Sequence, residues 1–377
     1  MSRVALFLGL LMAMMQTPAS ATPPPGKFKP ALSGYPYSFP RDHAAHEEYQ
    51  TEWWYYTGHL QAADGHTYGY QLTFFRSGMG HPSLAANPSR WAIQHLYLAH
   101  FAVTDENGKS FFYTDRVNRA GIENAGADTV PYHIWNGNWM VETVQSIPGE
   151  EQETSHHLVA SEKEWAIDLE LIPLKPPVIH GQGGISKKGE GATQASHYYS
   201  LTRMETRGTL KVHGRALEVK GTSWMDHEFG SNQLSENQMG WDWFGLQLDN
   251  GTELMFYQIR RKDGSLDPFS SGTIVHTNGS SQHLTLSDFQ IKPDGWWQSP
   301  KSNGKYPSAW TLLIPNQDMT LTLTPTVPDQ ELITTRSTGV TYWEGSVIIQ
   351  GTVQGKPMKG KGYVELTGYS EWMQRQF

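Results

Sequence analysis

The densest group of acid–base side chains in the sequence lies in one short stretch that is also rich in tryptophan. Its acid–base residues are Asp226, His227, Glu228, Glu236 and Asp242, and its tryptophans are Trp224, Trp241 and Trp243. A carboxyl group beside indole rings loses part of its hydration, so its pKa rises and it becomes a better proton donor near neutral pH. Aromatic faces also stabilise a developing cation. The stretch therefore fits acid–base chemistry on an apolar molecule.

An internal repeat draws attention to Asp242. The run from Trp54 to Gly58 (WYYTG) resembles the run from Trp241 to Gly245 (WDWFG), 187 positions later. The first run has Tyr55 where the second has Asp242, so the strand itself does not require an acid there. We therefore take Asp242 as the first candidate for the proton donor, with Asp226 as the second. The alternative is a hydrogen-bond and salt-bridge network that joins two domains, since such networks also perturb pKa values.

A second polar cluster lies nearer the N-terminus, where His43 and His46 stand among Asp42, Glu47 and Glu48. Two histidines three positions apart, with acids beside them, bind metal in some helices. The zinc-protease spacing His-Glu-x-x-His does not occur in the chain, and a solvated entry segment is the simpler interpretation. We assign no metal ligand and expect no cofactor. The chain also lacks the Gly-x-Ser-x-Gly elbow that supports a serine nucleophile.

Turn signals and short aromatic strands recur along the whole chain and predict an all-β protein. Asn-Gly and Asp-Gly pairs, which accept the positive φ angles of hairpin turns, separate runs that alternate in polarity. No helical stripe exceeds about three turns. Antiparallel meanders of this kind close into barrels or sandwiches. Together with the repeat, the pattern predicts two β-barrel domains, residues 46–235 and 236–377, preceded by an extended segment, residues 22–45.

The N-terminus is typical of an export signal. Arg3 precedes an apolar run from Val4 to Met15, and Ala19-Ser20-Ala21 matches a small-residue cleavage site. We expect cleavage after Ala21 and a secreted or periplasmic protein; an uncleaved N-terminal anchor is the alternative. No other stretch is apolar enough to span a membrane.

Composition narrows the range of partners. The 377 residues carry a formal net charge of −8, which disfavours nucleic acid because phosphate binding needs a basic surface. The chain has no cysteine, which excludes disulfides, cysteine metal sites and thiol nucleophiles. Aromatic residues make up 12% of the chain, which is enough to build a substantial core and excludes global disorder. The oligomeric state cannot be predicted from these observations.

Several motifs resemble the carotenoid 1,2-hydratase (hydroxyneurosporene synthase) superfamily, and in particular its secreted AttH-like branch, often called predicted secreted hydrolases. The matching segments are residues 52–58 (EWWYYTG), 223–230 (SWMDHEFG), 240–244 (GWDWF), 306–310 (YPSAW), 342–345 (YWEG) and 362–369 (GYVELTGY). They extend over nearly all of the chain after the export signal. The resemblance implies two lipocalin-like β-barrel domains, which agrees with the repeat. Carotenoid hydratases add water across an isoprenoid double bond, and the secreted branch has no demonstrated reaction.

These observations lead to one functional hypothesis. We expect an exported protein that binds a small apolar molecule, terpenoid or lipid-like, and that acts as a cofactor-free hydratase or lyase by alkene protonation. The acid would be Asp242 or Asp226, with water polarised by His227 or Glu228. The residues expected to bind the substrate are Trp224, Trp241, Trp243, Trp54 and Tyr56. The alternatives are a carrier without chemistry, since small barrels hold single ligands, and a hydrolase.

Overall fold

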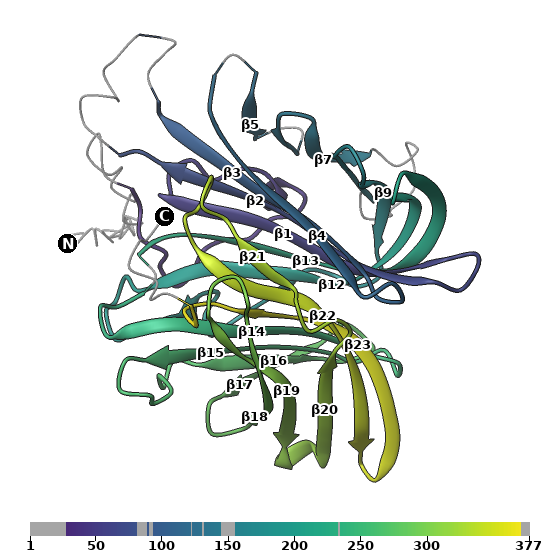
Figure 1. The fold of residues 1–377 in the computed structure, drawn as a ribbon. Helices are drawn as coiled ribbons and strands as arrows, with labels where there is room; N and C mark the ends of the chain where they lie inside the picture. Colours follow the sequence, from purple (N-terminus) through teal and green to yellow (C-terminus); the bar gives the residue numbers. More distant parts are fainter. Residues whose placement is uncertain are drawn as a thin grey trace, which may run out of the picture.

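The computed structural model describes residues 28–80, 89, 93–121, 123–129, 132–144, 155–232 and 234–370. The predicted export signal and its cleavage site lie outside these residues. The described chain is almost entirely β, with two 3-10 turns at Arg41–His43 and Pro315–Gln317. No helix among the described residues is long and apolar enough to cross a membrane. The strands form two antiparallel sheets that lie one above the other (Figure 1).

The first sheet contains the strands up to residue 232, in the spatial order β4-β3-β2-β1-β13-β12-β9-β8-β7-β6-β5. Its ends approach each other, because β4 contacts both β5 and β6. Two short strands, β10 and β11, pair with β12. The strand bounds are β1 (Thr51–Ala62), β2 (Thr67–Gly78), β3 (His95–Asp105), β4 (Ser110–Arg119), β5 (Ala125–Asp128), β6 (His133–Asn136), β7 (Trp139–Val144), β8 (Ser155–Ser161), β9 (Ala166–Pro173), β10 (Val178–Ile179), β11 (Ser186–Lys187), β12 (Ala195–Val212) and β13 (Arg215–Asn232).

The second sheet repeats this plan in the order β17-β16-β15-β14-β23-β22-β20-β19-β18, with β21 paired to β22. Its strand bounds are β14 (Gln238–Leu248), β15 (Glu253–Arg261), β16 (Ser271–Val275), β17 (Ser281–Thr285), β18 (Gln290–Gln298), β19 (Lys305–Ile314), β20 (Met319–Pro325), β21 (Glu331–Ile333), β22 (Thr341–Val353) and β23 (Lys356–Leu366). The strands of Trp54 and Trp241, β1 and β14, occupy equivalent places. Each lies between its hairpin partner and the last strand of its own sheet, which confirms the equivalence of the two strands.

The residue-by-residue match of the repeat, however, is wrong by one position. Trp54 and Tyr56 point into the core of the first sheet, whereas Trp241 and Trp243 leave the core of the second sheet and point toward the first. Because the side chains of a strand alternate between its two faces, these opposite orientations mean that the structural match is shifted by one residue from the offset of 187. By face, Tyr55 corresponds to Trp243 and not to Asp242.

The three largest of the five apolar cores among the described residues hold the two sheets together. Each sheet curves around its own core, and a third core, made of side chains from the outer faces of both sheets, lies between them. Strands β1 and β14 are therefore hydrophobic on both faces, since one face covers the core of its own sheet and the other the neighbouring sheet. In Figure 1 the two strands run in adjacent layers, where the outer faces of the two sheets meet.

Candidate functional site

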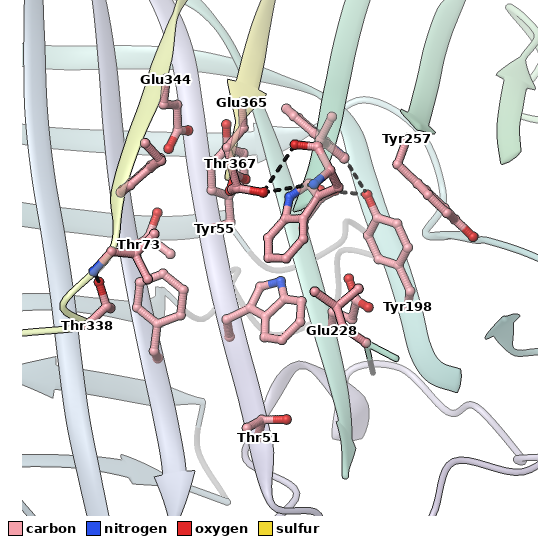
Figure 2. Close-up of a pocket in the computed structure, with 18 of the residues that line it drawn as sticks. Thr51, Tyr55, Thr73, Tyr198, Glu228, Tyr257, Thr338, Glu344, Glu365 and Thr367 are labelled. Carbon is pink, nitrogen blue, oxygen red and sulfur yellow. Dashed lines mark hydrogen bonds between the residues drawn. The ribbon is translucent and has the colours of Figure 1, made fainter. Parts of the chain in front are cut away.

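A cavity of about 380 Å³ lies between the two sheets, and its walls come from the outer faces of both. Strands β1, β2, β3, β12 and β13 supply one wall, and β14, β15, β22 and β23 supply the other. Figure 2 shows Glu344 and Glu365 at one end of this cavity and Thr51 toward the other. Because each strand alternates between its own core and the cavity, only every second residue of a strand reaches the site. The cavity thus belongs to neither barrel interior; both described interiors are filled by large side chains.

Aromatic rings form much of the cavity wall. Trp53 and Tyr55 come from β1, Trp241 and Trp243 from β14, and Tyr257 from β15. The ring of Tyr55 meets that of Trp243 edge to face, with centroids 5.1 Å apart. Rings of this size fix the shape of a cavity, and their faces attract positive charge. The wall therefore suits an apolar ligand or a cationic intermediate.

Asp226, on β13, is the carboxyl group best placed for proton transfer. It is almost fully buried at the cavity wall and accepts three hydrogen bonds. Trp224 Nε1 donates to Oδ1 over 2.6 Å, Tyr198 Oη donates to Oδ2 over 2.7 Å, and Ser200 Oγ also donates to Oδ1. Burial raises the pKa of Asp226 to about 7, aided by the nearby Glu228 and opposed by the three hydrogen bonds. Asp226 is therefore poised between acid and conjugate base at neutral pH.

Two hydrogen-bonded chains hold the donors of Asp226 in place. Trp243 Nε1 donates to Tyr198 Oη over 3.0 Å, which leaves the Tyr198 hydroxyl hydrogen for Asp226. On the other side, His180 Nε2 lies 2.7 Å from Ser200 Oγ. Because the Ser200 hydroxyl donates to Asp226, this histidine nitrogen carries a hydrogen and donates to Ser200. Both chains stabilise the carboxylate that remains after Asp226 has given up its proton.

Two further carboxyl groups, Glu344 and Glu365, face each other across the β22–β23 ladder. Burial raises the pKa of Glu365 to about 8, and the charges of Asp226 and Glu228 add to the shift while the Trp241 indole opposes it. Burial, reinforced by Glu365, also raises the pKa of Glu344 well above its usual range. Two buried carboxyl groups this close do not both ionise readily, so the pair retains protons at neutral pH.

The fourth carboxyl group of the cavity is paired with a lysine. Lys188 Nζ lies 3.3 Å from Glu228 Oε1 and 4.0 Å from the centre of the Tyr257 ring. Burial opposes the charge on Lys188, but Glu228 outweighs it and raises the pKa of the lysine. Ser196 donates a further hydrogen bond to Glu228. Glu228 is thus an ion-pair partner that places a fixed negative charge near Asp226.

Asp242, the first candidate from the sequence, is placed elsewhere. Its carboxylate accepts hydrogen bonds from Arg260 Nε and Tyr369 Oη, both over 2.9 Å, and it does not line the described cavity. Burial raises its pKa, but the Arg260 guanidinium acts in the opposite direction. The geometry gives a structural ion pair that ties β14 to β15 and to the C-terminal Tyr369. A role for Asp242 as proton donor has no geometric support.

His227, Trp54 and Tyr56 also lie outside the cavity, in the interior of the first sheet. The Trp54 indole stacks on His227 with ring centres 4.9 Å apart, and its Nε1 donates to the carbonyl of His43. Tyr56 shares hydrogen bonds with Tyr132 and His156. Of the nine residues expected to form the site, the structure brings Asp226, Glu228, Trp241 and Trp243 to the cavity wall, and Trp224 reaches it through Asp226.

The second polar cluster closes one end of the first sheet. Glu52 Oε1 lies 2.8 Å from both His46 Nδ1 and His227 Nε2, and Arg76 Nε donates to Glu52 Oε2 over 3.0 Å. Burial opposes the charge on His46, but hydrogen bonds to Asp42 and Glu52 outweigh it and raise its pKa to about 9. His46, Glu52 and His227 have the composition of a metal site. Since Arg76 and the His46 imidazolium already neutralise Glu52, the group fits an ion-pair network better than a cation site.

Sequence reasoning missed Glu344, Glu365, Lys188 and Tyr198. Glu344 and Glu365 stand in the motifs YWEG and GYVELTGY, which indicated only a resemblance to the family. Their spacing along the chain gives no hint that β22 and β23 bring them to face Asp226. The alternation of side chains along a strand could have revealed them. Glu365 stands between Val364 and Leu366 in a buried strand, so its side chain points to the opposite face from theirs, away from the core of its own sheet.

Comparison with known proteins agrees with this architecture. Residues 30–369 match a family model described as AttH-like. The chain belongs to the AttH-like family. This confirms the resemblance seen in the motifs, and the fold is that of the family. A crystal structure of an AttH protein from Nitrosomonas europaea is 32% identical, covers 91% of this chain and 100% of its own, and superposes with a TM-score of 0.79.

More distant relatives of this AttH-like chain are hydratases and dehydratases. A kievitone hydratase from Fusarium solani subsp. phaseoli is 28% identical over 198 residues, which are 50% of this chain and 54% of that protein. The dehydratase asqC of Emericella nidulans is 23% identical over 222 residues, 56% of this chain and 61% of its own length. The chain thus matches little more than half the length of these relatives. The structure of kievitone hydratase from Nectria haematococca shares the fold, at 18% identity, 92% coverage of this chain, 98% of its own and a TM-score of 0.68.

Proposed function

We propose that this AttH-like protein is a cofactor-free hydratase or dehydratase that acts on an apolar molecule bound between its two sheets. The observation that carries the proposal is Asp226: a buried carboxyl group with a pKa near 7, held by three donors and set in an aromatic cavity. The names of the distant relatives support the same class of reaction. The apolar character of the substrate is inferred from the aromatic wall.

In the hydration direction, the Asp226 carboxyl donates its proton to one carbon of an alkene. A C–H bond forms from the π electrons, and the neighbouring carbon becomes cationic beside the rings of Trp241 and Trp243. The donors from Tyr198, Ser200 and Trp224 stabilise the Asp226 carboxylate left behind, so the same hydrogen bonds that hold the acid favour release of its proton.

A water molecule then completes the addition. Its oxygen forms a bond to the cationic carbon, and one of its protons passes to the Asp226 carboxylate, which restores the acid. Dehydration is the same sequence reversed, with Asp226 accepting the proton that the cation loses as the alkene forms. Exclusion of bulk water by the two sheets limits other reactions of the cation.

Substitution of the acid tests this proposal. Purified protein is incubated with a panel of prenylated and terpenoid alkenes and their tertiary alcohols, and products that differ by one water are sought by mass spectrometry. We expect Asp226→Asn to lower turnover by about 100- to 10,000-fold. Asp242→Asn is the matched control, since Asp242 lies outside the cavity, and the folded variant should keep its activity.

The results of this experiment distinguish a hydratase from a carrier and from a hydrolase. Equal turnover by the wild type and Asp226→Asn would contradict the acid assignment. A ligand that co-purifies and is returned unchanged would favour a carrier, and a product cleaved at an ester would favour a hydrolase. Export is a separate proposal, based on the N-terminal sequence, and is tested by N-terminal mass spectrometry of the protein from a periplasmic fraction. A mature start at Thr22 would support it.

A further inference from the structure

The cavity between the sheets contains more negative than positive groups. Its acids are Asp226, Glu228, Glu344 and Glu365, and Lys188 is the cation among the described residues that line it. Lys188 is paired with Glu228, while Asp226, Glu344 and Glu365 have no ion-pair partner among the described residues. The remaining titratable group of basic type, His100, has its pKa lowered to about 4 by burial and is neutral.

The hydrogen-bonding capacity left open in this cavity lies mainly on acceptors. Glu344 Oε1 and Gln71 Oε1 have no hydrogen-bond partner in the described structure. Both atoms are buried, since each residue is only 2% exposed. Gln71 donates hydrogen bonds through Nε2 to Thr73 and to Tyr342, and its amide oxygen Oε1 accepts none. The Tyr55 hydroxyl interacts with the Glu344 carboxyl group and has one hydrogen to donate, so it leaves Gln71 Oε1 and the remaining acceptor capacity of Glu344 open.

Buried acceptors without donors are costly and are normally satisfied by a ligand or by water. A ligand group with several hydrogen-bond donors and a positive charge best matches this end of the cavity. Its donors meet the open acceptors, and its charge suits the unpaired carboxyl groups and the aromatic faces. An alcohol brings one donor and no charge, and a carboxylate adds to the existing repulsion. Figure 2 shows Glu344, Glu365 and Tyr55 gathered at the end of the cavity where such a group would lie.

We propose that this end of the cavity, formed by Glu344, Glu365 and Gln71, binds a protonated amine carried by an otherwise apolar ligand. This rests on the proposed function, because it names the chemical class of the molecule that occupies the same cavity. Burial keeps protons on Glu344 and Glu365 at neutral pH when the site is empty. A bound ammonium group displaces such protons, so binding of the amine is coupled to proton release.

Three probes with the same alkyl chain test this proposal: octylammonium, 1-octanol and octanoate. Binding to the full chain without its signal is measured by isothermal titration calorimetry at pH 7. We expect octylammonium to bind at least about tenfold more tightly than 1-octanol, and octanoate to bind most weakly, because only the ammonium relieves the unpaired carboxyl groups. Affinity of 1-octanol equal to or above that of octylammonium would overturn the proposal.

Two variants test whether the ammonium group binds at Glu344. Glu344→Gln should lower octylammonium affinity about tenfold and leave 1-octanol affinity unchanged. The control is Glu164→Gln, which removes an exposed carboxyl group between β8 and β9 and should leave the affinities for both probes as in the wild type. An unchanged octylammonium affinity in a folded Glu344→Gln protein would contradict the assignment.

A measurement on the wild type keeps the proposal testable if that variant does not fold. Titrations in two buffers of different ionisation enthalpy report protons released on binding. We expect release with octylammonium and none with 1-octanol; the absence of release with octylammonium would count against the amine. The two proposals fail separately, because tight 1-octanol binding without amine preference leaves the apolar site and its hydratase chemistry intact.

Discussion

Replacement of Asp226 by asparagine has an effect on folding stability that can be worked out from the structure. In the folded protein the pKa of this carboxyl group is about 7, against 3.8 for the unperturbed group. The folded state therefore binds a proton more tightly than the unfolded state. The contribution of Asp226 to the folding stability is fully present below about pH 4 and is lost as the pH rises through about 7. Asparagine resembles the protonated acid in shape and charge but cannot ionise, so the variant lacks this pH dependence.

The magnitude follows from proton linkage. Between the two pKa values the contribution of Asp226 falls by about 1.4 kcal/mol per pH unit, which gives a loss of about 2 kcal/mol from pH 5 to pH 7 once partial ionisation near pH 7 is included. The difference in unfolding free energy between Asp226→Asn and the wild type should shift in favour of the variant by this amount. The buried histidines titrate in both proteins, and their contribution cancels in the difference.

The assay is urea unfolding followed by tryptophan fluorescence at pH 5, 6 and 7. Asp249→Asn serves as the control, because Asp249 is an exposed carboxyl group in the turn after β14 and its loss should leave the pH dependence parallel to that of the wild type. If the curves of Asp226→Asn and the wild type are parallel across this range, the pKa of Asp226 is not raised and the argument for a proton donor fails.

Three other predictions concern the surroundings of the cavity. Asp242→Asn should lower the unfolding free energy by about 3–5 kcal/mol, because it leaves the largely buried guanidinium of Arg260 without its charged partner; a loss below about 1 kcal/mol in a urea melt would contradict the structural role. Trp243→Phe removes the indole donor to the Tyr198 hydroxyl and should reduce turnover about two- to tenfold while ligand affinity changes little, and kinetics that show the reverse would refute it. Asp115→Ala removes the carboxylate that holds Arg336, so hydrogen exchange should speed up in the loop before β22; unchanged exchange there would show that the loop does not depend on this tether.

The fold was predictable from local signals, while the site depended on strand pairing. Asn-Gly turns and alternating aromatic strands predicted two antiparallel sheets, since these features act over a few residues. The stretch around Trp224 also contained Asp226, which the structure places at the cavity wall. The structure places Asp242 outside the cavity, because the residues matched by the repeat lie on opposite faces of their strands, and the face decides whether a carboxyl group meets a cavity or an arginine. Glu344 and Glu365 could not be found, because they meet Asp226 only through contacts between two sheets far apart in the chain.

The central claim is that the cavity between the sheets adds or removes water with Asp226 as the acid. Its most direct test is incubation of the protein with an alkene substrate in water labelled with oxygen-18, followed by mass spectrometry of the product. We predict one labelled oxygen in the product of the wild type, and little or none with Asp226→Asn over the same time. An unlabelled product, or equal labelling by both proteins, would contradict the claim.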